Sequence, residues 1–252
     1  MEVLVVGNTA YVDDDFCAKA FPGDHVQVVA AQDTRRDESS PHASWKELLQ
    51  HLDQAYEFDR VVYLSNYLTP HTDTVGDIET LRSVFRACAG RRVQLLYVAG
   101  PAGAEGAADA AGRTGKGIIA RAANDLCRYY AAREGVQTKI LRVPFLYTAS
   151  AALEDPFLAP LFDACLTGSV ALQGAQDAAF PLLCAEELAV LVRRIFDSWD
   201  GNFETLDVAD TFHHASGEVG EALKALFPGL SVAYGDSAGY ALPVSDVVRV
   251  RY

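Results

Sequence analysis

The residues with the clearest chemical potential lie in one short segment near the start of the chain, GNTAYVDDD at positions 7–15. Gly7 follows the apolar run VLVV, and a glycine at the end of a strand lets backbone N–H groups approach a phosphate. The segment ends in three carboxylates, Asp13, Asp14 and Asp15. A carboxylate about 5 Å from a phosphate opposes its binding by roughly 1 kcal/mol in water and by several kcal/mol at an effective dielectric of about 20. The segment therefore predicts an anion site that the protein's own carboxylates fill; the alternative is that they only cap a helix and point away from an intact site.

Two further side chains could carry a proton. Lys116 stands in a long stretch without other lysines, and His71 lies in the polar segment SNYLTPHTDTVGD together with Asp73 and Asp77. Lysine and histidine act as general acids or bases when their surroundings bring the pKa toward neutrality. The ordinary alternatives are a surface lysine at a helix start and a polar loop without a chemical role.

No sequence pattern supports a metal site or a serine hydrolase. HExxH, grouped Cys/His pairs and GxSxG are missing from the sequence, and His213 and His214 are adjacent on the chain, which places them poorly to chelate one ion. The five cysteines are widely spaced and form no CxxC pair, and no signal-peptide pattern precedes them. A cytoplasmic location is therefore expected.

Charge and hydropathy limit the classes of partner that the chain is expected to bind. The chain has 21 Lys and Arg against 34 Asp and Glu, a formal net charge of −13, so a nucleic-acid backbone would be repelled. The longest apolar runs, such as VLVV and VVYL, are far shorter than the roughly 20 residues that cross a bilayer. Neither a nucleic acid nor a membrane is expected as a partner.

The elements that must position these residues follow from the hydrophobic pattern. Short β-rich apolar runs alternate with helical periodicity, which indicates βαβ units and a parallel sheet. Strands are predicted at 2–6, 25–29, 60–64, 93–98 and 138–143, and later in FETLDV. Helices are predicted at 14–20, 44–55, 77–89 and 115–133, and later in AEELAVLVRRIFDSW and GEVGEALKALF. The helix at 115–133 places on one face Ile118, Ile119, Ala122, Ala123, Leu126, Cys127 and Tyr130. Between strand and helix, 100–115 is predicted as a mobile loop.

Several segments together resemble the extended short-chain dehydrogenase/reductases, also called the NAD-dependent epimerase/dehydratase family. The similar segments are VLVVGNTAYV, FDRVVYLSN, RRVQLLYVAG, REGVQTKILRVPFLYT, FPLLCAEELAVLV and GNFETLDVAD. The resemblance implies an α/β fold, a Rossmann-type doubly wound parallel sheet with a small, shortened C-terminal substrate lobe. It also implies one domain, 1–252, in which 1–147 forms a dinucleotide-binding-like core and 148–252 forms lobe segments that return to the core.

The resemblance also implies a vestigial cofactor site. The family's glycine pattern GxxGxxG reads Gly7, Ala10 and Asp13 in this chain, so only the first glycine remains and NAD(P) is expected to bind weakly or not at all. After the second strand, Asp33 could accept a hydrogen bond from a ribose and Arg35 could hold a 2′-phosphate, which leaves NAD or NADP open; a solvated turn is the alternative. The cofactor-site candidates are Gly7, Asn8, Ala10, Tyr11, Asp13, Asp33 and Arg35.

The family's catalytic residues are not found at the matching positions. A Ser or Thr at the end of the fourth strand and a Tyr-x-x-x-Lys on the next helix normally transfer the proton. Here that strand ends in VAGP, and the family's Tyr and Lys fall near Lys116 and Ala120. Tyr129 and Arg133 form a Tyr-x-x-x-Arg, but they come about 15 Å too late along the helix. Lys116 and His71 remain weak catalytic candidates.

Two functions are predicted from this pattern. The first is a non-catalytic scaffold, a pseudoenzyme that binds a partner or a small molecule at the C-terminal edge of the sheet. The alternative is an NAD(P)-dependent reductase or epimerase that acts with non-standard residues on a carbonyl or sugar-like substrate. Because the family commonly pairs two helices across a dimer axis, a homo- or hetero-oligomer through helices 77–89 and 115–133 is expected. The second of these helices could also face only its own sheet.

Overall fold

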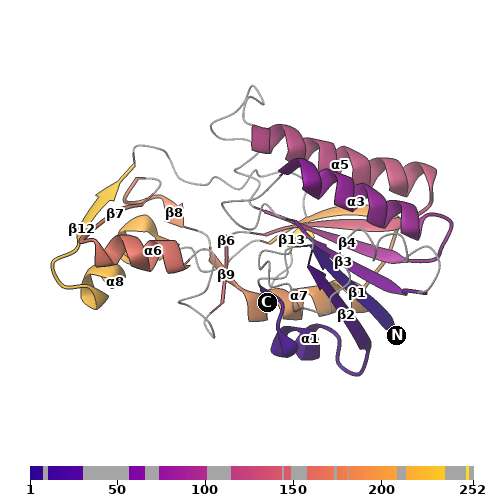
Figure 1. Cartoon of the computed structure of the whole chain (residues 1–252), viewed down its shortest axis with the longest axis horizontal. Helices are drawn as coiled ribbons and strands as arrows, with labels where there is room; N and C mark the ends of the chain where they lie inside the picture. Colours follow the sequence, from indigo (N-terminus) through magenta and orange to yellow (C-terminus); the bar gives the residue numbers. More distant parts are fainter. Residues whose placement is uncertain are drawn as a thin grey trace, which may run out of the picture.

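The computed structural model describes residues 1–7, 11–30, 57–65, 74–100, 115–143, 145–148, 158–172, 175–180, 182–208, 214–235 and 248–249. Figure 1 shows a layered α/β core and, beside it, a smaller lobe built from later parts of the chain.

A parallel sheet forms the centre of the core. Its seven strands are β1 (Glu2–Gly7), β2 (His25–Ala30), β3 (Arg60–Leu64), β4 (Gln94–Ala99), β5 (Gln137–Arg142), β10 (Phe203–Asp207) and β13 (Val248–Arg249). Their order in space is β13-β10-β5-β4-β3-β1-β2, and every neighbouring pair is parallel. Because the order runs outward from β1 in both directions, the sheet is doubly wound, and the predicted Rossmann-type α/β class is confirmed.

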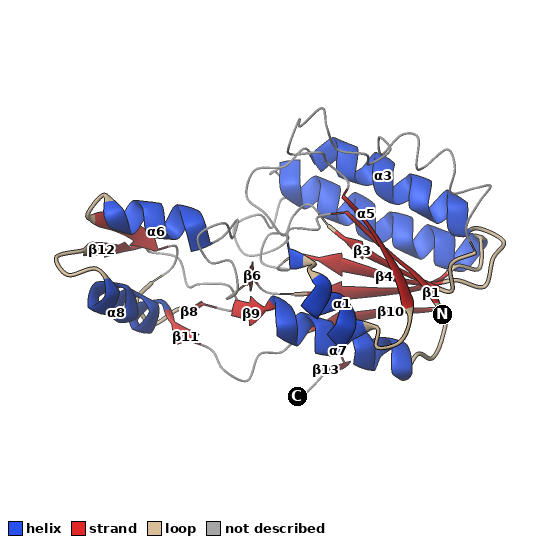
Figure 2. Cartoon of the chain, turned by 60° about the horizontal axis from the view of Figure 1, so that its bottom comes forward, coloured by secondary structure: helices blue, strands red, loops and turns tan. Residues whose placement is uncertain are grey.

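Helices cover both faces of this sheet, as Figures 1 and 2 show. One face carries α1 (Asp14–Ala20) and α7 (Ala185–Asp197). The other face carries α3 (Thr74–Cys88) and α5 (Gly115–Arg133), which lie side by side. Each face therefore has its own hydrophobic core.

The side chains of β1 alternate between these two cores. Val3 and Val5 belong to the core under α1 and α7, whereas Leu4 and Val6 belong to the core under α3 and α5. Successive side chains of a strand point to opposite faces of the sheet, so a strand covered on both faces must be apolar at every position. This explains the uninterrupted run VLVV.

The lobe combines two helices with short strand pairs. Its elements are α6 (Leu158–Leu166), β7 (Ser169–Leu172), β8 (Ala179–Phe180), β11 (His214–Ala215), α8 (Ser216–Leu226) and β12 (Ser231–Tyr234). β7 and β12 pair in parallel, and a small core of their side chains and those of the two helices includes Cys165, Leu172 and Leu223. A further pair, β6 (Phe145–Tyr147) and β9 (Leu182–Cys184), lies between lobe and core in Figure 1.

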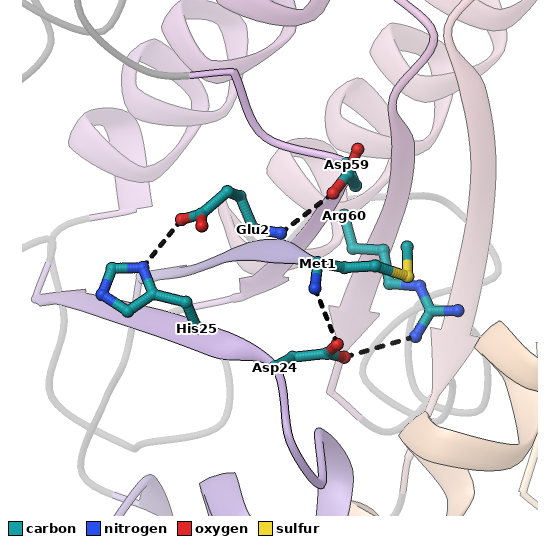
Figure 3. Close-up of polar contacts among 6 residues, drawn as sticks. All are labelled: Met1, Glu2, Asp24, His25, Asp59 and Arg60. Carbon is teal, nitrogen blue, oxygen red and sulfur yellow. Dashed lines mark hydrogen bonds and ion pairs between the residues drawn. The ribbon is translucent and has the colours of Figure 1, made fainter.

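A polar network ties together the starts of the first three strands (Figure 3). It consists of two sets of contacts, one of Glu2 with His25 and Asp59 and the other of Asp24 with Met1 and Arg60. Asp24 accepts from the amino group of Met1 at 3.0 Å and lies 3.8 Å from Arg60, and the backbone N–H of Glu2 donates to Asp59 at 2.9 Å. Asp24 and Arg60 are largely buried, at 16% and 15% exposure, whereas the pair of Glu2 and His25 is exposed, and an exposed ion pair contributes only about 0–1 kcal/mol.

Most of the predicted elements of the core are confirmed within a few residues. The strand at 60–64 and the helices at 14–20 and 115–133 match the structure, whereas the helix predicted at 77–89 spans Thr74–Cys88. The helix predicted at 44–55 and nearly all of the loop predicted at 100–115 lie outside the described residues.

The packing of α5 corrects one detail of the prediction. Ala123, Cys127 and Tyr130 are buried as predicted, but Ala122 is exposed. Each helical residue turns about 100° from the previous one, so the side chain next to Ala123 points away from the sheet. Leu126 is half-buried, and the side chains of Ile118 and Ile119 lie outside the described residues.

Gly7 closes β1 at the point where the strand order reverses. It pairs with Leu64 of β3 and has a φ of +109°, a backbone conformation that favours glycine. A Cβ at this position would lie 2.1 Å from the carbonyl oxygen of Leu64. The two strand ends can therefore approach this closely only because residue 7 has no side chain.

Replacing Gly7 by Ala is expected to destabilise the protein more than replacing Gly23, whose φ is also positive, at +81°, but whose Cβ would meet no atom within 4 Å. Gly23→Ala should lower the free energy of unfolding by about 1–2 kcal/mol through backbone strain alone. Gly7→Ala should add a further steric loss of about 1–3 kcal/mol. Urea denaturation followed by circular dichroism measures both, and equal losses would contradict the close approach of β1 and β3.

Candidate functional site

The candidate site lies at the carboxyl edge of the sheet, between β1 and β3. Ligands of open α/β sheets bind outside the carboxyl ends of the strands, at the point where the strand order reverses. Gly7 and Ser65 mark this point, because they lie at the ends of neighbouring strands. The site is therefore built from these two strand ends and from the starts of the helices α1 and α3.

A carboxylate caps the N-terminus of α1. Asp13 has extended backbone angles as the N-cap, and its Oδ1 accepts a hydrogen bond from the backbone N–H of Phe16 at 2.7 Å. Asp14 and Asp15 occupy the first turn, where negative charge stabilises a helix. The Asp13 carboxylate thus occupies one of the free N–H groups that a bound phosphate uses at a helix start.

Tyr11 contributes to the core rather than to an open cleft. Its side chain is 3% exposed and packs in the same core as Val3, Val5 and Phe16. Only its backbone is left for the predicted cofactor contact. Among the other predicted cofactor residues, four lie outside the described residues, namely Asn8, Ala10, Asp33 and Arg35.

Asp77 is turned into the protein, at the start of α3. Its carboxylate is buried and accepts from the hydroxyl of Tyr63 at 2.6 Å and from the hydroxyl of Ser65 at 3.2 Å. Asp77 was predicted to share a polar cluster with His71 and Asp73, which both lie outside the described residues. The described contacts instead join α3 to the end of β3. The hydrophobic pattern of the sequence does not reveal this role.

The environment of Tyr63 keeps its hydroxyl protonated. Burial, followed by repulsion from Asp77, raises the pKa of Tyr63 well above its ordinary value of 10.0. A tyrosine acts as a base only as phenolate, so Tyr63 serves as a hydrogen-bond donor at neutral pH. Its ring also lies 5.9 Å from that of Tyr97 on β4, which ties the two strands together.

The positions of the expected catalytic set carry other side chains. β4 ends at Ala99, which has no hydroxyl. The two tyrosines of α5, Tyr129 and Tyr130, lie about 21 Å from the start of the helix, toward the opposite edge of the sheet. Tyr130 stacks on Phe85 with ring centroids 4.7 Å apart, whereas Tyr129 is 53% exposed. Lys116 lies in the first turn of α5, and its side chain is outside the described residues.

An ion pair that the sequence analysis missed closes the carboxyl edge between β5 and β10. Arg142 and Asp207 are paired in the strand register, and Arg142 donates from Nη2 to Asp207 at 2.6 Å and from Nε to the other carboxylate oxygen. Both side chains are largely buried. A bidentate arginine–carboxylate pair has fixed geometry, so neither group is left to bind a ligand alone. The signal for it was the position of each residue at the end of its strand.

The hollows found among the described residues lie elsewhere. An apolar cavity of about 10 Å³ at the amino edge has room for roughly one water and is lined by Leu4, Phe58, Val61, Val84, Ala87, Cys88, Arg91 and Val93. A shallow, open depression on the lobe is lined by Gln176, Asp177, Ala215, Gly217, Glu218 and Glu221. The described part of the chain contains no group of three His, Cys, Asp or Glu side chains arranged to hold a metal ion. Within it, no helix combines the length and the hydropathy needed to span a bilayer.

Comparison with known proteins identifies the fold. No protein-family model and no curated protein matches the chain. Among solved structures, the dTDP-glucose 4,6-dehydratase of Streptomyces venezuelae with NAD bound aligns with a TM-score of 0.71 at 14% identity, over 96% of this chain and 88% of that chain. The UDP-glucuronic acid 4-epimerase of Bacillus cereus in complex with NAD aligns with a TM-score of 0.68 at 12% identity, over 97% and 94%.

A third solved structure, the UDP-glucose 4-epimerase of Thermotoga maritima, aligns with a TM-score of 0.67 at 14% identity, over 94% of this chain and 86% of that chain. At these identities the likeness establishes the fold. The chain thus has the fold of NAD-dependent epimerases and dehydratases, as the sequence resemblance implied.

Replacing Tyr63 by Phe is expected to lower the free energy of unfolding by about 1–3 kcal/mol, because the buried carboxylate of Asp77 loses a donor. Tyr129→Phe serves as the matched control, since Tyr129 is exposed, and should change stability by less than about 0.5 kcal/mol. Urea unfolding at neutral pH measures both. Equal stabilities of the two variants would show that the Tyr63–Asp77 contact does not hold β3 and α3 together.

The same hydroxyl predicts a pH dependence. Above the ordinary tyrosine pKa of 10.0 the unfolded chain loses the Tyr63 proton while the folded protein keeps it. The unfolded state then binds fewer protons, so the free energy of unfolding falls as the pH rises. Tyr63→Phe lacks this group, and its stability should fall less steeply than that of the wild type between about pH 9.5 and pH 11. Parallel declines of the two proteins would contradict the raised pKa.

Proposed function

We propose that this chain is a degenerate member of the extended short-chain dehydrogenase/reductases that works as a non-catalytic binding subunit. The fold is that of enzymes whose solved structures contain NAD. The observation that carries the proposal is the hydrogen bond from the Phe16 N–H to the Asp13 carboxylate at the start of α1. In this proposal the scaffold remains and the cofactor site is closed.

The position of Asp13 opposes a pyrophosphate in two ways. First, the carboxylate takes up an N–H group at the helix start. Second, its charge and that of Asp14 repel an incoming phosphate by roughly 1 kcal/mol to several kcal/mol per carboxylate, depending on the local dielectric, whereas Asp15 is already paired with Lys19 at 2.6 Å. α1 also has only seven residues, so few peptide dipoles support a bound anion. The described residues therefore fit a dinucleotide poorly.

The side chains near the expected chemistry support the same proposal. β4 ends in Ala99 rather than in a hydroxyl residue, and Tyr129 and Tyr130 lie far from the carboxyl edge. Tyr63 is at this edge, but its hydroxyl is committed to Asp77 and its pKa is raised. A proton acceptor near neutral pH is thus not provided by these tyrosines.

In this role the carboxyl edge would hold a small molecule, and the helices α3 and α5 would contact a partner subunit. We also place the protein in a reducing compartment, the cytoplasm. All five cysteines are free thiols, and Cys88, Cys127 and Cys165 are buried. Buried thiols that form no disulfide are typical of reducing surroundings.

One observation favours a second function, an NAD(P)-dependent reductase or epimerase that acts on a carbonyl or sugar-like substrate. Gly7 retains the positive φ and the close strand contact of a cofactor-binding turn. Such an enzyme would hold the cofactor through backbone amides of residues 8–11 and would need a proton donor such as Lys116 or His71. It would also have to bind phosphate in spite of Asp13.

A titration with NADH separates the two functions. The wild type should show no thermal shift with NADH at about 0.5 mM, whereas an enzyme that binds NADH with a Kd of about 5 μM would gain roughly 2.7 kcal/mol. Asp13→Gly should raise the affinity for NADH by roughly tenfold or more, because the repulsion is removed. Glycine is a tolerated N-cap, so the variant should lose only about 0.5 kcal/mol of stability.

Asp14→Ala is the matched control for this titration, because it removes one neighbouring charge and leaves the Asp13–Phe16 hydrogen bond in place. Its affinity for NADH should change less than that of Asp13→Gly. Micromolar binding of NADH to the wild type, with no further gain in Asp13→Gly, would refute the closed site and favour the enzyme.

A further inference from the structure

The layer of α3 and α5 carries an unusual charge for this protein. The chain as a whole has a formal net charge of −13. Yet the C-terminal halves of these two helices and the turn after α3 expose six arginines, which we call the arginine face: Arg82, Arg86, Arg91, Arg92, Arg128 and Arg133. The exposed carboxylates of the same layer are fewer, namely Glu79, Asp125 and Glu134.

The two helices of the arginine face pack against each other. α3 and α5 lie side by side in Figures 1 and 2, and the stacked rings of Phe85 and Tyr130 join them. Arg128 lies over the ring of Phe203 at 5.9 Å. Among the described residues, neither Arg82 nor Arg86 forms an ion pair, and both are exposed on one stripe of α3. Their charges are therefore open to a partner.

A simpler explanation covers only part of this face. Arg86 and Arg133 lie in the last turns of their helices, where a cation stabilises the helix dipole. Arg82 lies a turn earlier, and Arg91 and Arg92 follow the helix in a turn. Stabilisation of helix ends does not account for these three arginines.

The starts of the helices on the opposite face of the sheet have the opposite charge. Asp14, Asp15, Glu186 and Glu187 are exposed at the starts of α1 and α7, and Lys19 is already bound to Asp15 and Glu186 at 2.6 and 3.1 Å. The two helix layers are separated by the sheet, which places them roughly 20 Å apart. Charges are screened over about 8 Å at physiological ionic strength, so a partner at the arginine face responds to the local positive charge rather than to the net charge.

We propose that the arginine face docks an acidic polypeptide segment of another protein. A second copy of this chain fits less well, because a symmetric dimer would bring together two faces of the same net positive charge. Tyr129, 53% exposed on α5, offers a large side chain beside the arginines, and Tyr and Arg are the residue types that dominate binding energy at interfaces. This inference rests on the partner-binding role proposed above, and it names the chemistry of the partner.

The test uses fluorescence anisotropy with a labelled polyglutamate peptide of about 16 residues and the full chain. The wild type should bind the peptide at about 50 mM salt and at least tenfold more weakly at about 200 mM salt. Arg82→Glu combined with Arg86→Glu should weaken binding at least tenfold at low salt. Circular dichroism checks that the variant is folded, and both positions are exposed.

Arg193→Glu combined with Lys224→Glu is the matched control, because it changes the net charge equally on exposed positions of α7 and α8. It should weaken binding by less than threefold. Equal losses in the two variants, or no binding at low salt, would overturn the proposal. The proposal would also be overturned if a single-stranded oligonucleotide of the same length bound more tightly than the peptide. A dimeric wild type together with a monomeric Arg82/Arg86 variant would overturn it as well. The NADH titration tests the non-catalytic role separately, so its result and the result of the peptide titration can differ.

Discussion

A side chain at position 7 would overlap the carbonyl oxygen of Leu64, and this backbone contact sets the geometry of the whole carboxyl edge. It brings the end of β1 against the end of β3 where the strand order reverses. On the β1 side, Tyr11 is buried in the core and α1 starts at Asp14. On the other strand, Ser65 follows directly and meets the start of α3. One contact between two backbones thus places both helix starts.

Each of these helix starts carries a carboxylate with a protein partner. Asp13 is exposed and binds the N–H of Phe16, whereas Asp77 is buried and binds the hydroxyls of Tyr63 and Ser65. Negative charge stabilises a helix start in either setting, so both residues are explained by the fold itself. The consequence for ligands differs: Asp13 changes what can approach from solvent, and Asp77 fixes the wall of the site.

The sequence predicted six of the seven core strands and helices such as α1, α5 and α7 well, because long periodic segments and two-sided apolar strands leave few alternatives; the two-residue strand β13 was not predicted. The short lobe elements, such as β8 and β11 with two residues each, were missed since so few residues show no periodicity. Contacts between distant segments were also missed. The inward turn of Asp77 depends on how α3 packs against β3. Arg142 and Asp207 each stand at the end of a strand, but their pairing depends on β5 and β10 becoming neighbours. The resemblance to a known family supplied the expected strand roles, but not these partners.

The path of the chain between core and lobe has a consequence for folding. After β5 the chain builds α6 and β7, returns to the core for α7 and β10, leaves again for α8 and β12, and comes back at β13. Because β7 and β12 pair with each other, the two excursions are joined inside the lobe. The chain therefore crosses between the core and the lobe four times. Because β7 and β12 come from different excursions of the chain, the lobe forms only when both segments are present, and its folding depends on contacts that are distant in the sequence.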